Sequence, residues 1–410
     1  MLDLSRRPSD RPWQTPGQFW PELTAATTHL DAPVAALHLG ALRHNAHDLL
    51  DRAAGTPLRV ASKSIRVRGV LEAILALPGY RGVLAYTLAE ALWLAETMTD
   101  VVVGYPTADR AAILRLGRSP ELAAAVTLMV DSIAHLDLVD AVLPPGRRAP
   151  IRVCLELDAA WELPVLGHLG VWRSPVHTPG DAGRLAAAIV ARSGFTLVGV
   201  MSYEAQVAGI GDKPAGKPLR GLATRWVRRR SVGELAERRS AAVAAVREIA
   251  PLEFVNGGGT GSVESTRADA SVTDIAVGSG FFGGHLFDHY ASFQPAPAAA
   301  IALSVVRKPS PDTAVLLGGG WIASGVPGAD RLPRLVWPEG LHLVPREMAG
   351  EVQTPVTGAA AARLRVGDRV WARHTKSGEL SEHVNEFALV ENGKVVDILP
   401  TYRGEGKAFL

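Results

Sequence analysis

Residues 253–262 read Glu-Phe-Val-Asn-Gly-Gly-Gly-Thr-Gly-Ser, a short apolar run that leads directly into a glycine-rich loop. The run is typical of a buried strand. The glycines let the backbone approach a ligand with several N–H groups, and Thr260 and Ser262 add hydroxyl donors. This chemistry suits a phosphate, although a tight connection between strand and helix explains the glycines equally well. The loop is neither a Walker loop nor a dinucleotide fingerprint, because the required patterns do not follow.

Strand-like and helix-like segments alternate between about residues 33 and 285. Eight short apolar runs are expected to form strands: Arg59–Ser62, Gly82–Ala85, Val101–Val103, Val126–Val130, Ile151–Leu157, Leu197–Met201, Glu253–Val255 and Asp274–Val277. Longer stretches with helical periodicity separate them. This order predicts an α/β fold, a (β/α)8 TIM-type barrel, with a doubly wound open sheet as the main rival. An earlier strand and helix, 34–39 and 41–50, are expected to precede the barrel.

A second glycine-rich loop, residues 277–284, follows the eighth expected strand. In a barrel, the loops after strands seven and eight commonly bind phosphate. Lys63 ends the first expected strand, which lies beside the eighth when a barrel closes. A poorly hydrated lysine loses its proton more easily and becomes a nucleophile, whereas a surface lysine is the ordinary alternative. An amine beside a phosphate cup fits the aldehyde cofactor pyridoxal 5′-phosphate.

The composition is that of a packed globular protein. The chain has 410 residues, which suggests two domains, and 47% of them are hydrophobic. A net charge of +2 gives no electrostatic case for nucleic acid or an acidic membrane. The single cysteine, Cys154, excludes a disulfide framework or a thiolate zinc cluster within one chain. Because no signal-peptide core and no apolar stretch of about 18 to 20 residues occurs, we expect a cytoplasmic protein.

The sequence changes character after about residue 286. Strand-like runs separated by Gly, Pro and Asn turns predict a mostly-β domain: Ile301–Val306, Ala314–Leu317, Arg334–Trp337, Arg369–Ala372, Phe387–Val390 and Lys394–Ile398. We therefore expect an N-terminal segment (1–30) that packs on the β domain, a barrel (31–285) and a C-terminal β domain (286–410). The basic stretch 225–230 is expected just before a helix, as a solvated helix start.

Taken together, these pieces resemble the alanine racemase N-terminal-domain superfamily, the fold-type III pyridoxal-phosphate enzymes. The matching pieces are Leu39-Gly40-Ala41-Leu42-Arg43-His44-Asn45, the strand that ends in Lys63, and the two glycine-rich loops. The tail Pro400–Lys407 and the segment Ser202–Gln206 look closer to the D-threonine aldolase and D-serine dehydratase branch, especially its amino acid deaminase/aldolase members.

The resemblance implies roles for individual residues. Lys63 would hold the cofactor as a Schiff base and later carry a proton. The residues that would line the phosphate are Gly258, Gly259, Thr260, Gly278 and Ser279. Tyr203 ends the sixth expected strand and would face the cofactor. Arg66, one turn after the lysine, would neutralise cofactor or substrate anions, with a surface arginine at a helix start as the alternative.

In the branch that the chain resembles, the β domain supplies a divalent-metal site from a His-x-Asp or His-x-Cys pair. Here His383 matches, and Asn385 replaces the acidic or thiolate ligand. An amide oxygen binds a divalent metal such as Mn, Mg or Zn weakly. Glu382, Glu386 or His374 could compensate, but alternation on a strand would point the glutamates away from His383. The roles expected for His383 are metal ligand or catalytic base, with a satisfied interface histidine as the alternative.

Two departures argue against a simple alanine racemase. Racemases place an arginine opposite the pyridine nitrogen, where this chain has Ala276. Their Arg-x-Gly-Val pattern after the fifth strand reads His168-Leu169-Gly170-Val171 here, and Arg173 is a candidate for the missing arginine.

The resemblance therefore implies a pyridoxal-phosphate-dependent lyase that cleaves β-hydroxy D-amino acids in a retro-aldol reaction through a Lys63 Schiff base. The alternatives are a D-serine or D-threonine dehydratase, an amino-acid racemase, a specialised enzyme that forms C–C bonds, or a non-enzymatic carrier of the cofactor. A nicotinamide or nucleotide enzyme is a more distant alternative. The expected partners are a small amino acid and a second copy of the chain in a homodimer, with no nucleic acid and no membrane.

Overall fold

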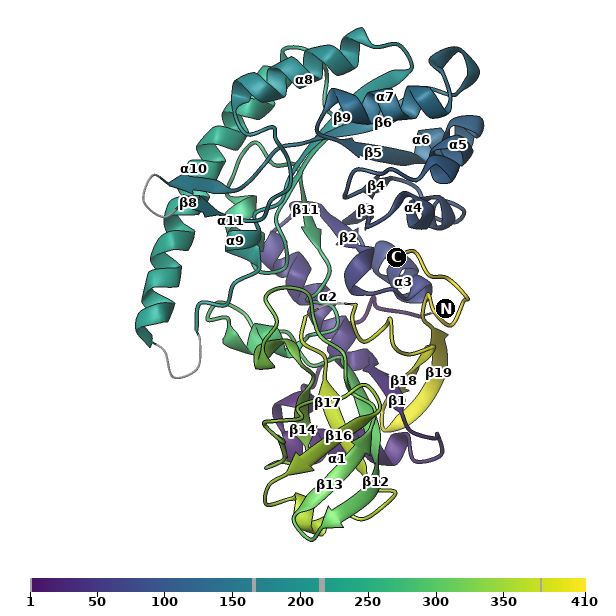
Figure 1. The fold of residues 1–410 in the computed structure, drawn as a ribbon, viewed down its shortest axis with the longest axis vertical. Coiled ribbons are helices and arrows are strands. Elements are labelled where there is room, and N and C mark those ends of the chain that lie inside the picture. Colours follow the sequence, from purple (N-terminus) through teal and green to yellow (C-terminus); the bar gives the residue numbers. More distant parts are fainter. Residues whose placement is uncertain (1, 164–166, 214–217, 377) are drawn as a thin grey trace. The chain divides into compact units, whose positions relative to one another are not determined.

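The computed structural model describes residues 2–163, 167–213, 218–376 and 378–410. These residues form two compact units. The barrel unit consists of Leu49–Lys63, Ile74–Gly278 and Phe409–Leu410, and the sheet unit consists of Met1–Asp48, Ser64–Ala73 and Ser279–Ala408. Figure 1 shows the elements of both units.

Eight parallel strands of the described chain close into a barrel within the barrel unit (Figure 1). They are β2 (Leu58–Ala61), β3 (Tyr80–Ala85), β4 (Val101–Val103), β5 (Val126–Val130), β6 (Ile151–Glu156), β9 (Phe195–Ser202), β10 (Phe254–Gly257) and β11 (Asp274–Val277). Strand β11 pairs with β2, so the first and last strands meet and the open-sheet alternative is excluded. The predicted (β/α)8 barrel is confirmed, because strands buried on both faces give continuous apolar runs.

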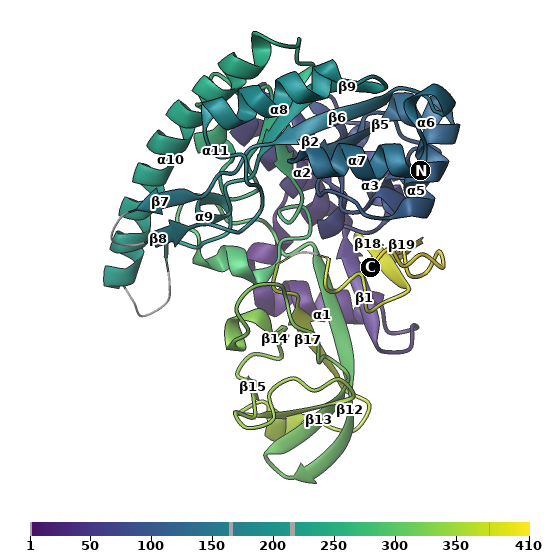
Figure 2. The same cartoon turned by 45° about the horizontal axis from the view of Figure 1, so that its top comes forward.

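Helices follow the strands and lie outside them in Figures 1 and 2. They are α4 (Leu88–Leu94), α5 (Arg110–Arg118), α6 (Pro120–Ala125), α7 (Ile133–Val142), α8 (Pro179–Ala191), α9 (Ala205–Ala208), α10 (Pro218–Arg247) and α11 (Val263–Arg267). Two more helices, α2 (Leu39–Ala53) and α3 (Arg68–Leu75), contain residues of both units. The basic stretch 225–230 lies inside α10, so the prediction that it precedes a helix was wrong.

The sheet unit is built on a sheet to which nine described strands belong. Its main path is β15 (His342–Leu343), β16 (Gln353–Thr357), β13 (Thr313–Leu317), β12 (Ala299–Ser310), β1 (Val34–His38), β18 (Glu386–Glu391) and β19 (Lys394–Pro400). Strand β17 (Arg369–Arg373) pairs with β12 and with β14 (Arg334–Trp337). The predicted mostly-β part of the fold is confirmed.

The N-terminal region contributes to this sheet. Helix α1 (Pro16–Ala26) packs Phe19, Trp20 and Leu23 in one apolar cluster with Trp371. Strand β1 pairs antiparallel with β12 and parallel with β18. The predicted domain boundaries stay predictions, but the compact units divide the chain elsewhere: residues 31–48 fall with the sheet, because β1 is one of its strands.

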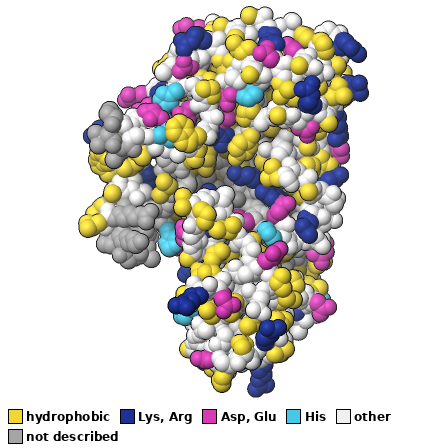
Figure 3. All heavy atoms as spheres, in the orientation of Figure 1, with side chains coloured by type: hydrophobic (Ala, Val, Ile, Leu, Met, Phe, Trp, Pro, Cys, Tyr) yellow, Lys and Arg dark blue, Asp and Glu magenta, His cyan; other side chains and the backbone are white. Residues whose placement is uncertain are grey.

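The distribution of charged side chains on the surface and the burial of the single cysteine agree with the composition. Basic and acidic side chains are interspersed over the face shown in Figure 3, in line with a net charge of +2. Cys154 is fully buried in β6. Among the described residues, no helix combines the length and the apolar character needed to cross a bilayer.

Candidate active site

The loops that follow the barrel strands hold most of the predicted site. Lys63 lies in a short turn, Ser62–Ser64, directly after β2 and is half-buried. Its Nζ donates a hydrogen bond to the hydroxyl of Tyr105 at 3.2 Å, and Tyr105 follows β4. Both residues come after the carboxyl ends of their strands, which is the face where (β/α)8 enzymes hold their active sites.

Arg173 joins this group from the segment after β6. Its guanidinium carbon lies 4.7 Å from the centre of the Tyr105 ring and 5.6 Å from that of Tyr203. The guanidinium also pairs with Glu156, the last residue of β6, and donates to the carbonyl of Gly104 at 2.8 Å. The structure thus brings the candidate arginine to the face that holds the lysine. Sequence reasoning missed Tyr105 and Glu156, although a tyrosine directly after a strand was a usable signal.

Burial and neighbouring charges shift the pKa values of the two phenols in this group. Burial raises the pKa of Tyr105, but Lys63 and Arg173 outweigh burial and lower the pKa below its ordinary value. Burial raises the pKa of Tyr203 to about 12. Burial also raises the pKa of Glu156, although Arg173 opposes the shift. Tyr105 is therefore the phenol suited to exchanging a proton, whereas Tyr203 keeps its proton.

The glycine loop, defined as residues 257–262, faces Tyr203. Gly258 has a φ of +78°, which favours glycine, and a Cβ there would lie 2.8 Å from Cγ2 of Ile275. A Cβ on Gly259 would lie 3.3 Å from a carbon of the Tyr203 ring. The backbone of the loop therefore packs closely against its neighbours, and larger residues would displace it.

The two glycine-rich loops meet at Thr260, whose Oγ1 accepts from the N–H of Gly278 at 3.4 Å. Strand β10 is separated from β2 only by β11, so the loop and Lys63 are two strand spacings apart, about 10 Å. These residues fit pyridoxal 5′-phosphate. An amine is present for its aldehyde, and a cradle of glycines that excludes Cβ atoms is present for its phosphate.

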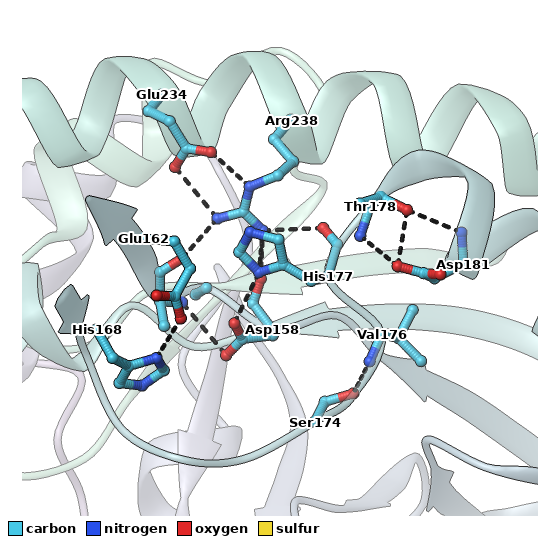
Figure 4. A network of polar contacts seen from close by, with 12 residues as sticks. Asp158, Glu162, His168, Ser174, Val176, His177, Thr178, Asp181, Glu234 and Arg238 are labelled. Atoms are coloured by element: carbon cyan, nitrogen blue, oxygen red, sulfur yellow. Dashed lines mark hydrogen bonds and ion pairs between the residues drawn. The ribbon is translucent and has the colours of Figure 1, made fainter. Parts of the chain in front are cut away.

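The segment that carries Arg173 is anchored to α10 (Figure 4). Arg238 of α10 donates to the carbonyls of Asp158 and His177 at 2.7 and 3.1 Å, and so ties both ends of the segment to the helix. The Asp158 carboxylate and Nδ1 of His177 lie 2.9 Å apart. Ser174, next to Arg173, donates to the carbonyl of Glu156 at 2.7 Å. These contacts fix the position of Arg173.

His168 does not take the place of the missing arginine. It lies on β8 (Gly167–Leu169), which pairs with β7 (Trp161–Leu163) in a two-stranded sheet. Its Nδ1 lies 2.5 Å from the carboxylate of Glu162, and its ring stacks on Trp172 with the ring centres 3.8 Å apart (Figure 4 shows the Glu162 pair).

Two predicted cofactor residues belong to the sheet unit. Arg66 has a φ of +52° and pairs with Glu382. Ser279 directly follows Gly278 in the chain and is half-buried. Because Glu382 engages Arg66, the charge of this arginine is already balanced within the unit.

The predicted metal ligands also lie in the sheet unit. His383 is exposed, stacks on Trp321 with the ring centres 5.3 Å apart, and has Nδ1 2.6 Å from the carbonyl of Glu379. A carbonyl is only an acceptor, so Nδ1 carries the proton and Nε2 is the basic nitrogen. His383 precedes β18, which begins at Glu386, so the strand alternation expected around it was wrong.

The donors present do not fit a tight metal site. His383 and Asn385 offer one imidazole and one neutral amide, and Glu382 is engaged by Arg66. Within the described part of the chain, no group of three or more His, Cys, Asp or Glu side chains is placed to hold a metal ion. The divalent metal stays a prediction, and no reaction step is assigned to it.

Comparison with known proteins agrees with the fold. The family described as alanine racemase, N-terminal domain, matches residues 37–283. A 3-hydroxy-D-aspartate aldolase of Paracoccus denitrificans is 30% identical over 259 residues, which are 62% of this chain and 60% of that enzyme. The chain therefore matches less than two thirds of the length of this curated relative.

Solved structures share the fold over most of the chain. D-threonine aldolase from Filomicrobium marinum aligns with a TM-score of 0.75 at 20% identity, over 92% of this chain and 96% of that one. D-threo-3-hydroxyaspartate dehydratase from Delftia sp. HT23 aligns with a TM-score of 0.69 at 19% identity, over 91% and 97%. Because the family match covers more than half of its residues, this chain belongs to the alanine racemase N-terminal domain family, as the sequence predicts.

Proposed function

We propose that this chain is a pyridoxal 5′-phosphate-dependent lyase that acts on β-hydroxy D-amino acids, with retro-aldol cleavage as its reaction. The observation that supports this most is the convergence of the Lys63 amine and the glycine loop on one end of the barrel. The relatives named above are an aldolase of 3-hydroxy-D-aspartate, an aldolase of D-threonine and a dehydratase of 3-hydroxyaspartate, which agrees with this substrate class.

When bound, the cofactor supplies an electron sink for negative charge at the α-carbon of an amino acid. The residues of this chain do the rest. Lys63 holds the cofactor through Nζ and then moves a proton at the α-carbon. Tyr105, whose hydroxyl is 3.2 Å from that nitrogen and whose pKa is lowered, exchanges the proton with Lys63. Arg173 orients the anionic parts of the bound molecules, and Tyr203 packs against the loop.

In the aldolase reaction, a base takes the proton of the β-hydroxyl, the Cα–Cβ bond breaks to release an aldehyde, and the α-carbon takes up a proton from Lys63 to give glycine. In the dehydratase reaction, Lys63 takes the α-proton and the β-hydroxyl leaves as water. The unsaturated amino acid that is released is then hydrolysed by water to a 2-oxo acid and ammonia. The dehydratase is the second candidate, because the Lys63–Tyr105 pair suits removal of an α-proton equally well.

The experiment that tests the proposal is a cofactor and product analysis. The purified protein is loaded with pyridoxal 5′-phosphate, its visible absorbance is recorded, and borohydride is added to fix any bond to lysine. D-threonine and 3-hydroxy-D-aspartate are then supplied. Glycine with acetaldehyde or glyoxylate identifies the aldolase, and ammonia with 2-oxobutyrate or oxaloacetate identifies the dehydratase. No cofactor binding, or binding without turnover of any amino acid, contradicts the proposal.

A homodimer and a cytoplasmic location are part of the same proposal. Both rest on the resemblance and the composition. The mass of the protein in solution, measured by light scattering, tests the dimer.

Replacing Arg173 with methionine is expected to lower kcat/KM by about 10²-fold. The variant removes the cation that lies over both tyrosines, and it leaves Glu156 buried without its partner. Initial rates across substrate concentrations measure the effect. Arg184→Met is the matched control, because this arginine is exposed and pairs with Asp181 of its own helix. Equal rates in the two variants would refute a role for Arg173.

Removal of divalent metal is expected to leave the activity unchanged, because His383 and Asn385 form at most a weak site. Rates are compared before and after dialysis against EDTA. Asn385→Asp adds a carboxylate two residues after His383 and should raise the affinity for Mn²⁺, measured by calorimetry, whereas Asn392→Asp in the turn before β19 should not. Loss of activity in EDTA that Mn²⁺ restores in the unmodified protein would show that the metal site is intact.

A further inference from the structure

Glu204 is a buried carboxylate behind the glycine loop. It follows Tyr203 at the end of β9 and is 2% exposed. Its carboxylate accepts hydrogen bonds from the N–H of Gly258 at 3.0 Å and from the hydroxyls of Ser262 and Thr266 at 3.3 and 2.5 Å. Glu204 therefore joins the beginning of the loop, its end, and the helix α11 behind it. Sequence reasoning assigned no role to this residue.

Arg239 of α10 balances the charge of Glu204. Its Nη1 lies 3.5 Å from the Glu204 carboxylate, its Nη2 lies 2.8 Å from that of Asp269, and the side chain is 3% exposed. A Cβ on Gly257 would lie 2.8 Å from the same Nη1, so the first glycine of the loop leaves room for Arg239. Burying a carboxylate without a nearby cation would be strongly unfavourable, and Arg239 supplies the opposite charge that offsets this cost.

Two further arginines hold the other side of the loop. Arg52 donates to the carbonyl of Thr260 at 2.7 Å, and Arg228 donates to that of Gly261 at 3.1 Å. In a trans peptide the C=O and N–H point in opposite directions, so the N–H of Gly261 faces away from Arg52. The two arginines thus hold the carbonyl oxygens of the loop, which would repel a phosphate, on one side of the loop. The backbone N–H donors of the same peptides point to the opposite side.

We propose that Glu204 is the positioning residue of the glycine loop, which it holds in the conformation that binds the phosphate of the cofactor. This inference rests on the proposed function, because it requires pyridoxal 5′-phosphate as ligand. Glu204 acts through Gly258, Ser262 and Thr266 and not by contact with the cofactor. Its loss leaves the buried N–H of Gly258 without its acceptor. It also removes the carboxylate that accepts from the hydroxyls of Ser262 and Thr266, so the loop loses its fixed shape.

The test compares pyridoxal 5′-phosphate with pyridoxal, which carries the same aldehyde and no phosphate. Binding of each is titrated with the apo forms of the unmodified protein, Glu204→Ala and Glu204→Gln, and thermal unfolding is recorded.

Glu204→Ala should bind pyridoxal 5′-phosphate at least about tenfold more weakly than the unmodified protein does, and pyridoxal with unchanged affinity. Glu204→Gln keeps an acceptor for Gly258 and should lie between. Glu237→Gln, an exposed change on α10, is the control.

Unchanged affinity of Glu204→Ala for pyridoxal 5′-phosphate would overturn the inference. An equal loss for both ligands would also overturn it, because that result marks general damage to the barrel. If Glu204→Ala does not fold, Glu204→Gln decides: a loss confined to the phosphate form supports the inference, and no loss overturns it. If the unmodified protein binds neither ligand, the result contradicts the proposed function and not the role of Glu204. Failure of the proposed function and failure of this inference are therefore distinguishable.

Discussion

Replacing Lys63 with alanine is expected to abolish the cofactor attachment that borohydride fixes and to lower turnover by roughly 10⁴-fold or more. The reason is chemical: the variant has no amine at the end of β2, where the loops of the barrel converge. Mass spectrometry of the borohydride-treated protein measures the attachment, and initial rates with both β-hydroxy amino acids measure turnover. Lys394→Ala, an exposed lysine at the start of β19, is the control and should keep both properties. A Lys63→Ala protein that still forms the borohydride-fixed adduct would contradict the assignment of Lys63 as the residue that attaches the cofactor.

The same variant has a second readout that needs no cofactor. Burial raises the pKa of Tyr105, and the cations Lys63 and Arg173 more than offset that effect. Removing Lys63 takes away part of the lowering, so the pKa of Tyr105 must rise. Ultraviolet titration of phenolate formation measures this shift, and Tyr105→Phe identifies the signal. An unchanged titration curve would mean that the amine and the phenol are not neighbours in solution.

The barrel could be predicted from local patterns because its strands are parallel and covered on both faces. Several strands are therefore mostly apolar runs without alternation, such as Val126–Val130, in which all five residues are buried. The short hairpin β7–β8 and the strand β15 were missed, since a few half-exposed residues give no such run. Strand β1 shows a different limit of prediction. Its apolar run identifies it as a strand, but the strands with which it pairs, β12 and β18, lie far along the chain and could not be predicted from local sequence.

The residues of the candidate site also divide into those that local sequence predicts and those that it does not. The glycine loop and Lys63 are marked by residue type next to a strand, so their places could be predicted. Arg173 reaches the site only because the segment after β6 folds back and is held by Arg238, a residue far along the chain. Glu204 looks like any polar residue in the sequence, and its function depends on donors more than fifty residues away. Contacts of this kind leave no periodic pattern.

The opposite end of the barrel carries a second buried network, built from residues at the beginnings of strands. Arg59 of β2 is fully buried and contacts Asp274 at 2.9 Å and Asp100 at 2.9 Å. Burial raises the pKa of Asp100, but Arg59 and Arg81 outweigh it and hold the pKa below its ordinary value. The ion pair therefore stabilises the fold at neutral pH, and its contribution is lost as the pH falls through the lowered pKa of the folded state. Arg59 and Asp274 link the first and last strands of the barrel.

Arg59→Met is accordingly expected to lower the free energy of unfolding by about 3–5 kcal/mol, because it leaves the Asp274 carboxylate buried without its cation. Urea denaturation followed by circular dichroism measures the loss. Arg81→Met is the matched control: its guanidinium also contacts Asp100, but it is 51% exposed, so the change should be below about 1 kcal/mol. Adding Asp274→Asn to Arg59→Met should recover part of the loss, since no buried charge then lacks a partner at that position. Equal stability of the two single variants would show that the barrel closes without this pair. The protein that remains folded should keep its kcat, because residues at this end of a (β/α)8 barrel serve stability and those at the other end serve the reaction.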